Sequence, residues 1–272
     1  MFKPKTNNIK IIFDFYEYKD EYKWRICDLD KILKWKTALY LDEWNIYNSW
    51  QKKLWWNIDY KRLYQFFTSF DSVKKIYIYK WTLKDSTKSK KEIWWLLQQW
   101  YEVVTKDVKL MKKSIDVVTL KSESDKSITR SFIRQSFLDK LNEREITIVN
   151  SFFKRLNNEW IFSIEDKKCN FDVEMWVDIL LDLERWNYDN FIIWTWDSDF
   201  YNIVEKILKT SNKVSIFSVW WLISSELNNT NVLKYDIRKI KNFICRNKFI
   251  DDDCNQYKIK FFNKTKQMSI DI

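Results

Sequence analysis

Carboxylates in this sequence gather where apolar runs stop. Asp42 closes the run ALYLD and is followed three residues later by Asn45. Asp197 and Asp199 directly follow the run FIIWTW, and Asp172 opens a helix-like segment after KKCNF. Carboxylates brought together repel one another unless cations neutralise them. If these four aspartates converge in space, they predict a metal site.

The metal is indicated by the available ligand types. The chain has no His, and its four Cys show no CxxC spacing, so a zinc site is not supported. Oxygen-only ligands favour Mg²⁺ or Mn²⁺. Asp178, six residues after Asp172, is a secondary candidate ligand.

Each of these acids also has a structural explanation. Asp197 or Ser198 could cap the helix that follows, Asp172 could cap its own helix, and Asp42 could be a turn residue. Together these explanations weaken, because a D-S-D sequence at the end of an apolar strand exceeds what a helix cap needs. The metal-site interpretation is therefore preferred.

The segments that must position these acids alternate between strand-like and helix-like patterns. Such alternation predicts an α/β fold, a three-layer α/β/α sandwich around a mainly parallel sheet. Ligands of such sheets bind beyond the carboxyl ends of the strands, near the switch in strand order. The expected strands of the sheet are 37–43, 74–80, 101–108, 190–196 and 213–219.

The pattern also suggests a domain organisation. We expect an N-terminal extension over 1–36 with an extra strand at 9–19, and a main domain over 37–245. A polar, helical insertion interrupts that domain at about 119–166, and a tail follows over 246–272 with a strand-like run, YKIKFF.

Glycine is missing from this chain, whereas 17 tryptophans are present. Several of them, including Trp100, Trp186 and Trp196, stand where helix or strand patterns end. A bulky residue at positive φ is a steric outlier, and glycine is favoured there. We hypothesise that the source reads the codon UGA as glycine and that UGA was here translated as tryptophan. The alternative is a genuinely Trp-rich protein.

Bulk properties restrict the partners. The formal charge of +10 and a pI near 9.2 favour a polyanionic partner, nucleic acid before membrane surface. The sequence contains no apolar run of membrane-spanning length and no signal-peptide pattern at its N-terminus. We expect a soluble, cytoplasmic protein with no membrane partner. The sequence carries no signal for an oligomeric state.

With glycine restored at the tryptophans, the chain from Thr37 to Ile244 resembles the NYN domain, the LabA-like branch of the PIN-like nucleases. The segment TWDSDF is similar to that family's Ser/Thr-Gly-Asp-x-Asp-Phe signature, with Trp196 in the place of glycine. The insertion and both termini depart from the family pattern. The segments that carry the resemblance, in chain order, are ALYLDEWNIYNS, WYEVVTKDVK, KKCNFDVEMWVDILLD, NFIIWTWDSDFYNIVEKI and KVSIFSVWWLISSELNNTNVLKYDI.

The resemblance implies a metal-dependent ribonuclease that hydrolyses phosphodiester bonds of single-stranded RNA, with Mg²⁺ or Mn²⁺ as cofactor. Asp42 and Asp197 would be the closest metal ligands, and Asp172 and Asp199 would bind directly or through water. Asn45 would orient Asp42 or touch the scissile phosphate. The expected substrate-binding residues are Thr195, Ser198 and Lys168.

Two other classes of function stay open. The domain could be an RNA- or protein-binding regulatory module with weak or no catalysis. An aspartyl-phosphate phosphatase also places acids at strand ends, but it needs an Asp-x-Asp pair after its first strand. Here that position reads Asp-Glu-x-Asn, from Asp42 to Asn45.

Overall fold

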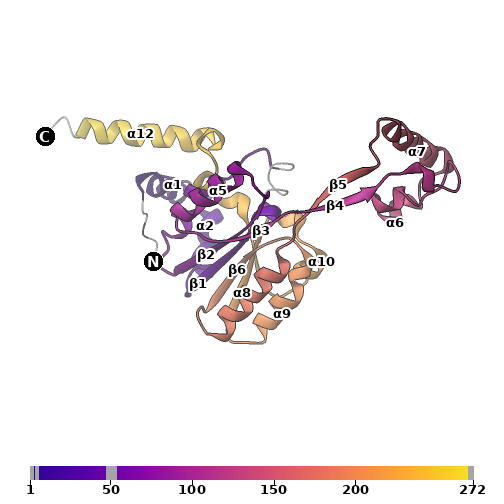
Figure 1. Ribbon diagram of the computed structural model, residues 1–272. Coiled ribbons are helices and arrows are strands. Elements are labelled where there is room, and N and C mark those ends of the chain that lie inside the picture. The colour runs from indigo at the N-terminus through magenta and orange to yellow at the C-terminus, as the bar shows by residue number, and fades with distance from the viewer. Residues whose placement is uncertain (1–2, 4–5, 47–53, 269–272) are drawn as a thin grey trace. The chain divides into compact units, whose positions relative to one another are not determined.

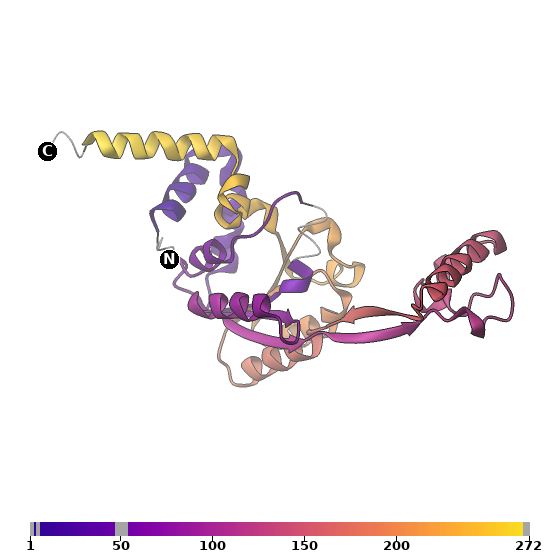
Figure 2. The ribbon, with the colours of Figure 1, turned by 45° about the horizontal axis from the view of Figure 1, so that its top comes forward.

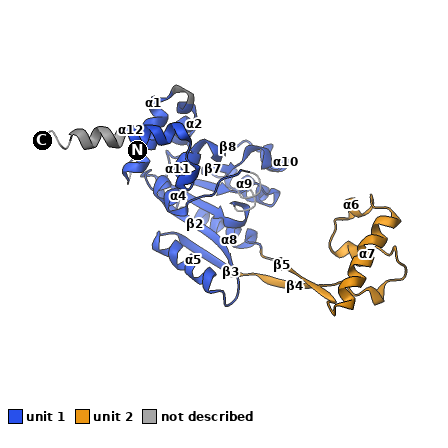
Figure 3. Cartoon of the chain, turned by 90° about the horizontal axis from the view of Figure 1, so that it is seen from above, with its two compact units in different colours: residues 1–106, 170–272 blue, residues 107–169 orange. Residues whose placement is uncertain are grey.

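The computed structural model describes the backbone of residues 3, 6–46 and 54–268. The side chains of 20–21, 167–168 and 261–268 lie outside the described set. The chain divides into two compact units (Figure 3). Unit 1 comprises Met1–Lys106 and Asn170–Ile272, and unit 2 comprises Asp107–Cys169.

Unit 1 is built on a six-stranded sheet with the strand order β3-β2-β1-β6-β7-β8 (Figure 1). Parallel pairing joins β1 to β2 and to β6, β6 to β7, and β7 to β8. The strands are β1 (Thr37–Asp42), β2 (Val73–Thr82), β3 (Glu102–Asp107), β6 (Asn190–Trp194), β7 (Lys213–Ser218) and β8 (Leu233–Asp236).

Helices cover both faces of this sheet, which gives the expected three-layer α/β/α architecture. Figure 1 shows α8 and α9 side by side on one face and α5 with the N-terminal helices on the other. The helices of unit 1 are α1 (Asn7–Tyr18), α2 (Asp20–Ile32), α4 (Tyr60–Phe67), α5 (Thr87–Gln98), α8 (Asp172–Glu184), α9 (Tyr201–Leu208), α10 (Ser225–Asn228), α11 (Lys241–Ile244) and α12 (Asp252–Met268).

The central strands are buried on both faces, as a parallel sheet between two helical layers requires. Every residue of β1 is buried. Leu39 and Leu41 pack into the core with Phe66 and Phe67 of α4. Tyr40, one residue out of step, faces the other layer, and its hydroxyl donates a 2.8 Å hydrogen bond to Asp182 of α8. Alternate residues of β1 therefore serve opposite helical layers.

The strand order reverses its direction between β1 and β6. From β1 the chain moves outward through β2 to β3, and from β6 it moves the other way through β7 to β8. Leu41 pairs with Trp194, so the carboxyl ends of β1 and β6 lie next to each other. This place is the topological switch point, where α/β sheets bind their ligands.

Helices, rather than strands, form both ends of unit 1. The strand expected at 9–19 is wrong, because this segment forms α1. Ile9, Ile12, Phe15 and Tyr16 are buried at helical spacing and pack in the main core, so tertiary contacts select the helix. The YKIKFF run of the tail likewise lies within α12. Within the described residues, no helix has the length and apolar character needed to cross a lipid bilayer.

Unit 2 combines an antiparallel pair of strands with helices (Figure 2). Its small core contains Ile115, Ile128 and Phe153. The longest helix begins with a capping box between Asn142 and Glu145. The elements of unit 2 are β4 (Lys109–Ser114), β5 (Ser163–Lys168), α6 (Gln135–Leu138) and α7 (Glu143–Asn158).

Three helices end on a tryptophan in the left-handed conformation. The φ angles are 65° at Trp100, 64° at Trp160 and 53° at Trp186. In each case the N–H groups of the tryptophan and of the next residue bond to carbonyls three and five residues back. This is a Schellman motif, and its left-handed position is usually glycine. The sequence correctly predicted that Trp100 and Trp186 occupy such positions.

Candidate metal centre

Three carboxylates meet beside the switch point. Asp172, Asp197 and Asp199 each offer an oxygen, and the three oxygens lie within 4.8 Å of one another. Asp172 is the first residue of α8, while Asp197 and Asp199 follow β6. The first two side chains are half-buried, and Asp199 is exposed. We refer to these residues as the acidic trio.

Hydrogen bonds fix Asp172 at the start of α8. The side-chain oxygen of Asn170 accepts a 2.7 Å hydrogen bond from the N–H of Asp172. From β3, Lys106 donates to the carbonyl of Asn170 at 3.1 Å and to Glu174 at 2.6 Å. Burial raises the pKa of Asp172, a hydrogen bond between its carboxyl and the side chain of Asn170 lowers it, and the charges of the other two trio members raise it.

The other two acids are positioned through Thr195. Its hydroxyl accepts hydrogen bonds from the side-chain amide of Asn45 at 3.0 Å and from the N–H of Asp197 at 3.1 Å. Asp197 then accepts a 3.1 Å bond from the N–H of Asp199, as the cap of a short 3₁₀ turn. Asp197 thus caps this turn while it belongs to the trio. Thr195 is fully buried, and its hydroxyl connects Asn45 to Asp197; its expected role in binding substrate stays a prediction.

Asp42 lies outside the 4.8 Å group. It is buried, and its Oδ1 accepts bonds from the N–H groups of Trp44 at 2.8 Å and Asn45 at 3.3 Å. Burial raises the pKa of Asp42 to about 7, the two backbone bonds oppose this rise, and the charge of Asp172 adds to it. The negative charge of Asp172 therefore acts on the carboxyl group of Asp42. The role of Asp42 as a metal ligand stays a prediction.

The remaining expected residues have different surroundings. Asp178 accepts a 2.8 Å hydrogen bond from the hydroxyl of Tyr79 and lies outside the trio. Ser198 is half-buried between the two acids of the turn. The side chain of Lys168 lies outside the described residues. Sequence reasoning missed Lys106, which tethers the start of α8, because its partners are more than sixty residues away.

The acidic trio suits a hard divalent cation. All its donors are carboxylate oxygens, as Mg²⁺ and Mn²⁺ prefer. Across the described residues this is the one group of at least three acidic, His or Cys side chains close enough to share an ion. The carboxylates would otherwise repel one another, so a cation would relieve an unfavourable arrangement.

One family model matches part of this chain. The model of the NYN domain matches residues 124–236, from inside unit 2 to the last residue of β8. The match includes all of the acidic trio, whereas β1 and Asp42 precede it. The NYN domain belongs to the PIN-like nuclease superfamily.

Two known proteins are similar to parts of this chain. The Low amplitude and bright protein LabA of Synechococcus elongatus is 23% identical over 111 residues, which is 41% of this chain and 59% of LabA. The crystal structure of a protein of unknown function from Vibrio parahaemolyticus aligns with 78% of this chain and 97% of its own, at 16% identity and a TM-score of 0.46. Residues 124–236 of the chain thus match the NYN domain, and the chain is similar to part of LabA.

Proposed function

We propose that this protein is a metal-dependent ribonuclease that hydrolyses phosphodiester bonds in single-stranded RNA. The observation that carries the proposal is the acidic trio, three carboxylates within 4.8 Å of one another beside the switch point. The NYN domain and the formal charge of +10 support RNA as the partner.

Asp172, Asp197 and Asp199 would hold Mg²⁺ or Mn²⁺. A bound cation supplies positive charge against the negative charge that builds on the phosphate oxygens during hydrolysis. Asp42 is the fourth acid, either as a further ligand or as a proton acceptor outside the trio. Its pKa, raised to about 7 by burial, suits proton transfer near neutral pH.

Asn45 and Thr195 position the residues of the site through hydrogen bonds. Their 3.0 Å bond ties the turn after β1 to the end of β6, and Thr195 also holds the N–H of Asp197. Ser198, which lies between Asp197 and Asp199 in the sequence, is a proposed contact for the RNA. Lys168 is a proposed contact for the RNA backbone, where a lysine binds without reading sequence.

The experiment is cleavage of a labelled single-stranded RNA with Mg²⁺ or Mn²⁺, comparing the wild type with Asp197→Asn. Asp178→Asn is the matched control, since Asp178 bonds Tyr79 and lies outside the trio. We expect Asp197→Asn to lower the rate by at least 10²-fold, the scale on which electrostatic groups act, and the control to cut RNA. Equal cleavage rates of the wild type and Asp197→Asn would show that these acids do not take part in catalysis.

The same assay separates the alternative function. If neither wild type nor Asp197→Asn cuts RNA although both retain it, the domain is an RNA-binding regulatory module. If neither cuts nor retains RNA, a protein partner becomes the better hypothesis.

A further inference from the structure

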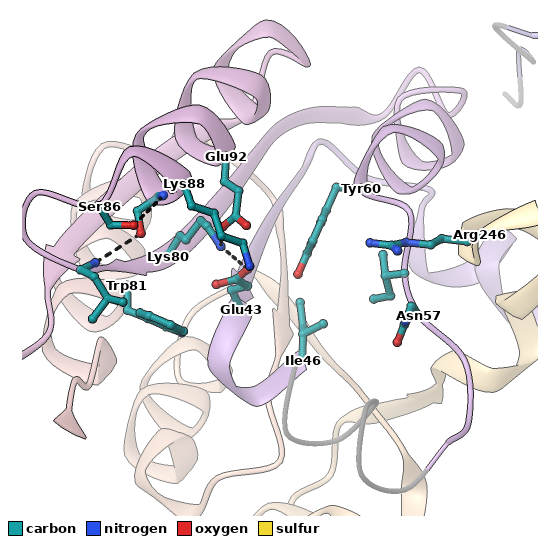
Figure 4. Close-up of a pocket in the computed structure, with 13 residues that line it drawn as sticks. Glu43, Ile46, Asn57, Tyr60, Lys80, Trp81, Ser86, Lys88, Glu92 and Arg246 are labelled. Carbon is teal, nitrogen blue, oxygen red and sulfur yellow. Dashed lines mark hydrogen bonds and ion pairs between the residues drawn. The ribbon is translucent and has the colours of Figure 1, made fainter. Parts of the chain in front are cut away.

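A second polar site begins at Glu43, the residue after Asp42, and contains no member of the acidic trio. It is a cavity of about 430 Å³ between β2, the start of α5 and the segment after α11 (Figure 4). A neighbouring cavity of about 420 Å³ shares Glu43, Lys80 and Glu92 with it. Small-molecule sites typically measure about 300–1,000 Å³. Each cavity is therefore large enough for a ligand.

The two sites are connected through neighbouring residues at the end of β1. The charge of Asp172 acts on Asp42, the last residue of the strand, whereas Glu43, the next residue, lines the cavity. Residues 43–46 are helical, so the chain direction changes between the two side chains. An RNA strand that passes over this end of the sheet would meet both sites.

A buried ion pair forms the floor of the cavity. The ammonium of Lys80 lies 2.5 Å from Glu43 and 3.2 Å from Glu92. The side chains of Lys80 and Glu43 are only 9% and 10% exposed, whereas Glu92 is 45% exposed and adds a second carboxylate to the one ammonium. These ion pairs form without a ligand, and they occupy the three charged groups. A ligand would therefore be bound by other residues of the cavity.

The groups available to a ligand lie on the rim. Lys88 comes from the first turn of α5 and Arg246 from the segment after α11, and both line the cavity and are exposed. Neither forms an ion pair with another residue of the described chain. Between them stands the half-buried ring of Tyr60, toward which Arg246 points (Figure 4). The cavity thus offers two unneutralised cations and an aromatic face.

The geometry points to this cavity as a site for a nucleoside phosphate, and specifically for a nucleotide of the RNA strand that neighbours the scissile bond. Lys88 and Arg246 bind the phosphate, and the ring of Tyr60 receives the base, since every base presents a face that stacks on an aromatic ring. This assignment rests on the proposed function, because it takes the strand to be the substrate of the acidic trio.

Binding is tested with the full chain carrying Asp197→Asn, so that RNA is not consumed. Lys88→Ala with Arg246→Ala is compared with the matched control Lys90→Ala with Lys248→Ala, two exposed cations of the same segments that do not line the cavity. We expect about tenfold weaker binding of a single-stranded oligonucleotide in the first variant. The slope of log affinity against log salt should also fall by about 0.7, because the two cations neutralise one phosphate of the single strand. The control should change affinity by less than twofold.

Competition identifies the ligand chemistry. The nucleotide 5′-AMP should displace the oligonucleotide at least tenfold better than ribose 5-phosphate or inorganic phosphate. Equal competition by inorganic phosphate would overturn the nucleoside assignment. If the first variant loses 5′-AMP binding while RNA binding stays unchanged, the site takes a free nucleotide and the strand assignment is overturned.

These outcomes are separable from those of the proposed function. Cleavage by the wild type, together with unchanged RNA and 5′-AMP binding in the first variant, would reject the cavity and leave the nuclease standing. Loss of both bindings in the first variant, without cleavage by the wild type, would keep the cavity and reject the nuclease.

Discussion

The side-chain amide of Asn45 donates a 3.0 Å hydrogen bond to the hydroxyl of Thr195. The two residues are 150 positions apart in the chain, and both are buried. Their bond joins the turn after β1 to the end of β6, the two strands of the switch point. Because Thr195 also accepts from the N–H of Asp197, the bond connects Asn45 to the acidic trio.

Breaking this bond should therefore lower activity through misplacement of Asp197. We expect Thr195→Val to reduce RNA cleavage by at least tenfold and stability by about 1–3 kcal/mol, because it leaves the amide of Asn45 unpaired. Thr195→Ser keeps the hydroxyl and should recover most of the activity. Cleavage rates and urea unfolding of both variants measure the two effects. Equal activity of Val and Ser variants would contradict a role for the hydroxyl.

Metal binding should depend on the trio and not on the other acids of α8. Mn²⁺ added to the wild type should raise its melting temperature, because an ion that binds only the folded state stabilises it. Asp172→Asn should remove most of this increase, whereas Asp178→Asn should retain it although the bond from Tyr79 changes. Calorimetric titration with Mn²⁺ gives the affinities directly. Loss of binding in both variants would show a general effect of charge.

The stability of the metal-free protein should depend on pH through Asp42. Its pKa is about 7 in the folded protein, mainly because of burial, against an ordinary value of 3.8. Between these values the folded state binds the extra proton. Stability therefore falls as pH rises from about 4 to 7, and the loss is complete above pH 7.

Asp42→Asn removes this charge and keeps an oxygen for the bonds from Trp44 and Asn45. We expect it to stabilise the protein by on the order of 2 kcal/mol at pH 8 and to change little at pH 4. Urea unfolding at both pH values in the presence of a chelator measures the difference. A gain of the same size at both values would exclude titration of Asp42 as the cause.

The hypothesis that UGA encodes glycine predicts which tryptophans are misplaced. Trp100→Gly, Trp160→Gly and Trp186→Gly should each stabilise the chain by about 1 kcal/mol, because they relieve a left-handed backbone at a residue with a Cβ. Trp194 is 2% exposed and packs in the main core, so Trp194→Gly should cost about 3–5 kcal/mol.

Chemical denaturation of the four variants separates these effects. Destabilisation by all four substitutions would count against recoding. Trp196 belongs to neither group, since φ is not positive there, and its buried indole N–H has no partner among the described residues.

Local sequence patterns were sufficient to predict the elements whose residues are buried in a regular pattern along the chain. The apolar runs of β1 and β6 predicted central strands, because a strand buried on both faces is apolar throughout. The strand predicted at 9–19 was wrong, because this segment of alternating apolar and charged residues forms α1. Its buried face contacts α2, α11 and α12, and such contacts are invisible in a short window of sequence.

The sequence by itself determined the parallel sheet, the acids at its strand ends and the unusual positions of the tryptophans, since each is written in neighbouring residues. Only the tertiary structure decided that Asp172 joins Asp197 and Asp199, while Asp42 lies outside this group and Asp178 accepts a hydrogen bond from Tyr79. The reason is that the distance between two carboxylates depends on strand order and helix placement. These arise from packing between segments more than a hundred residues apart, which no local pattern encodes.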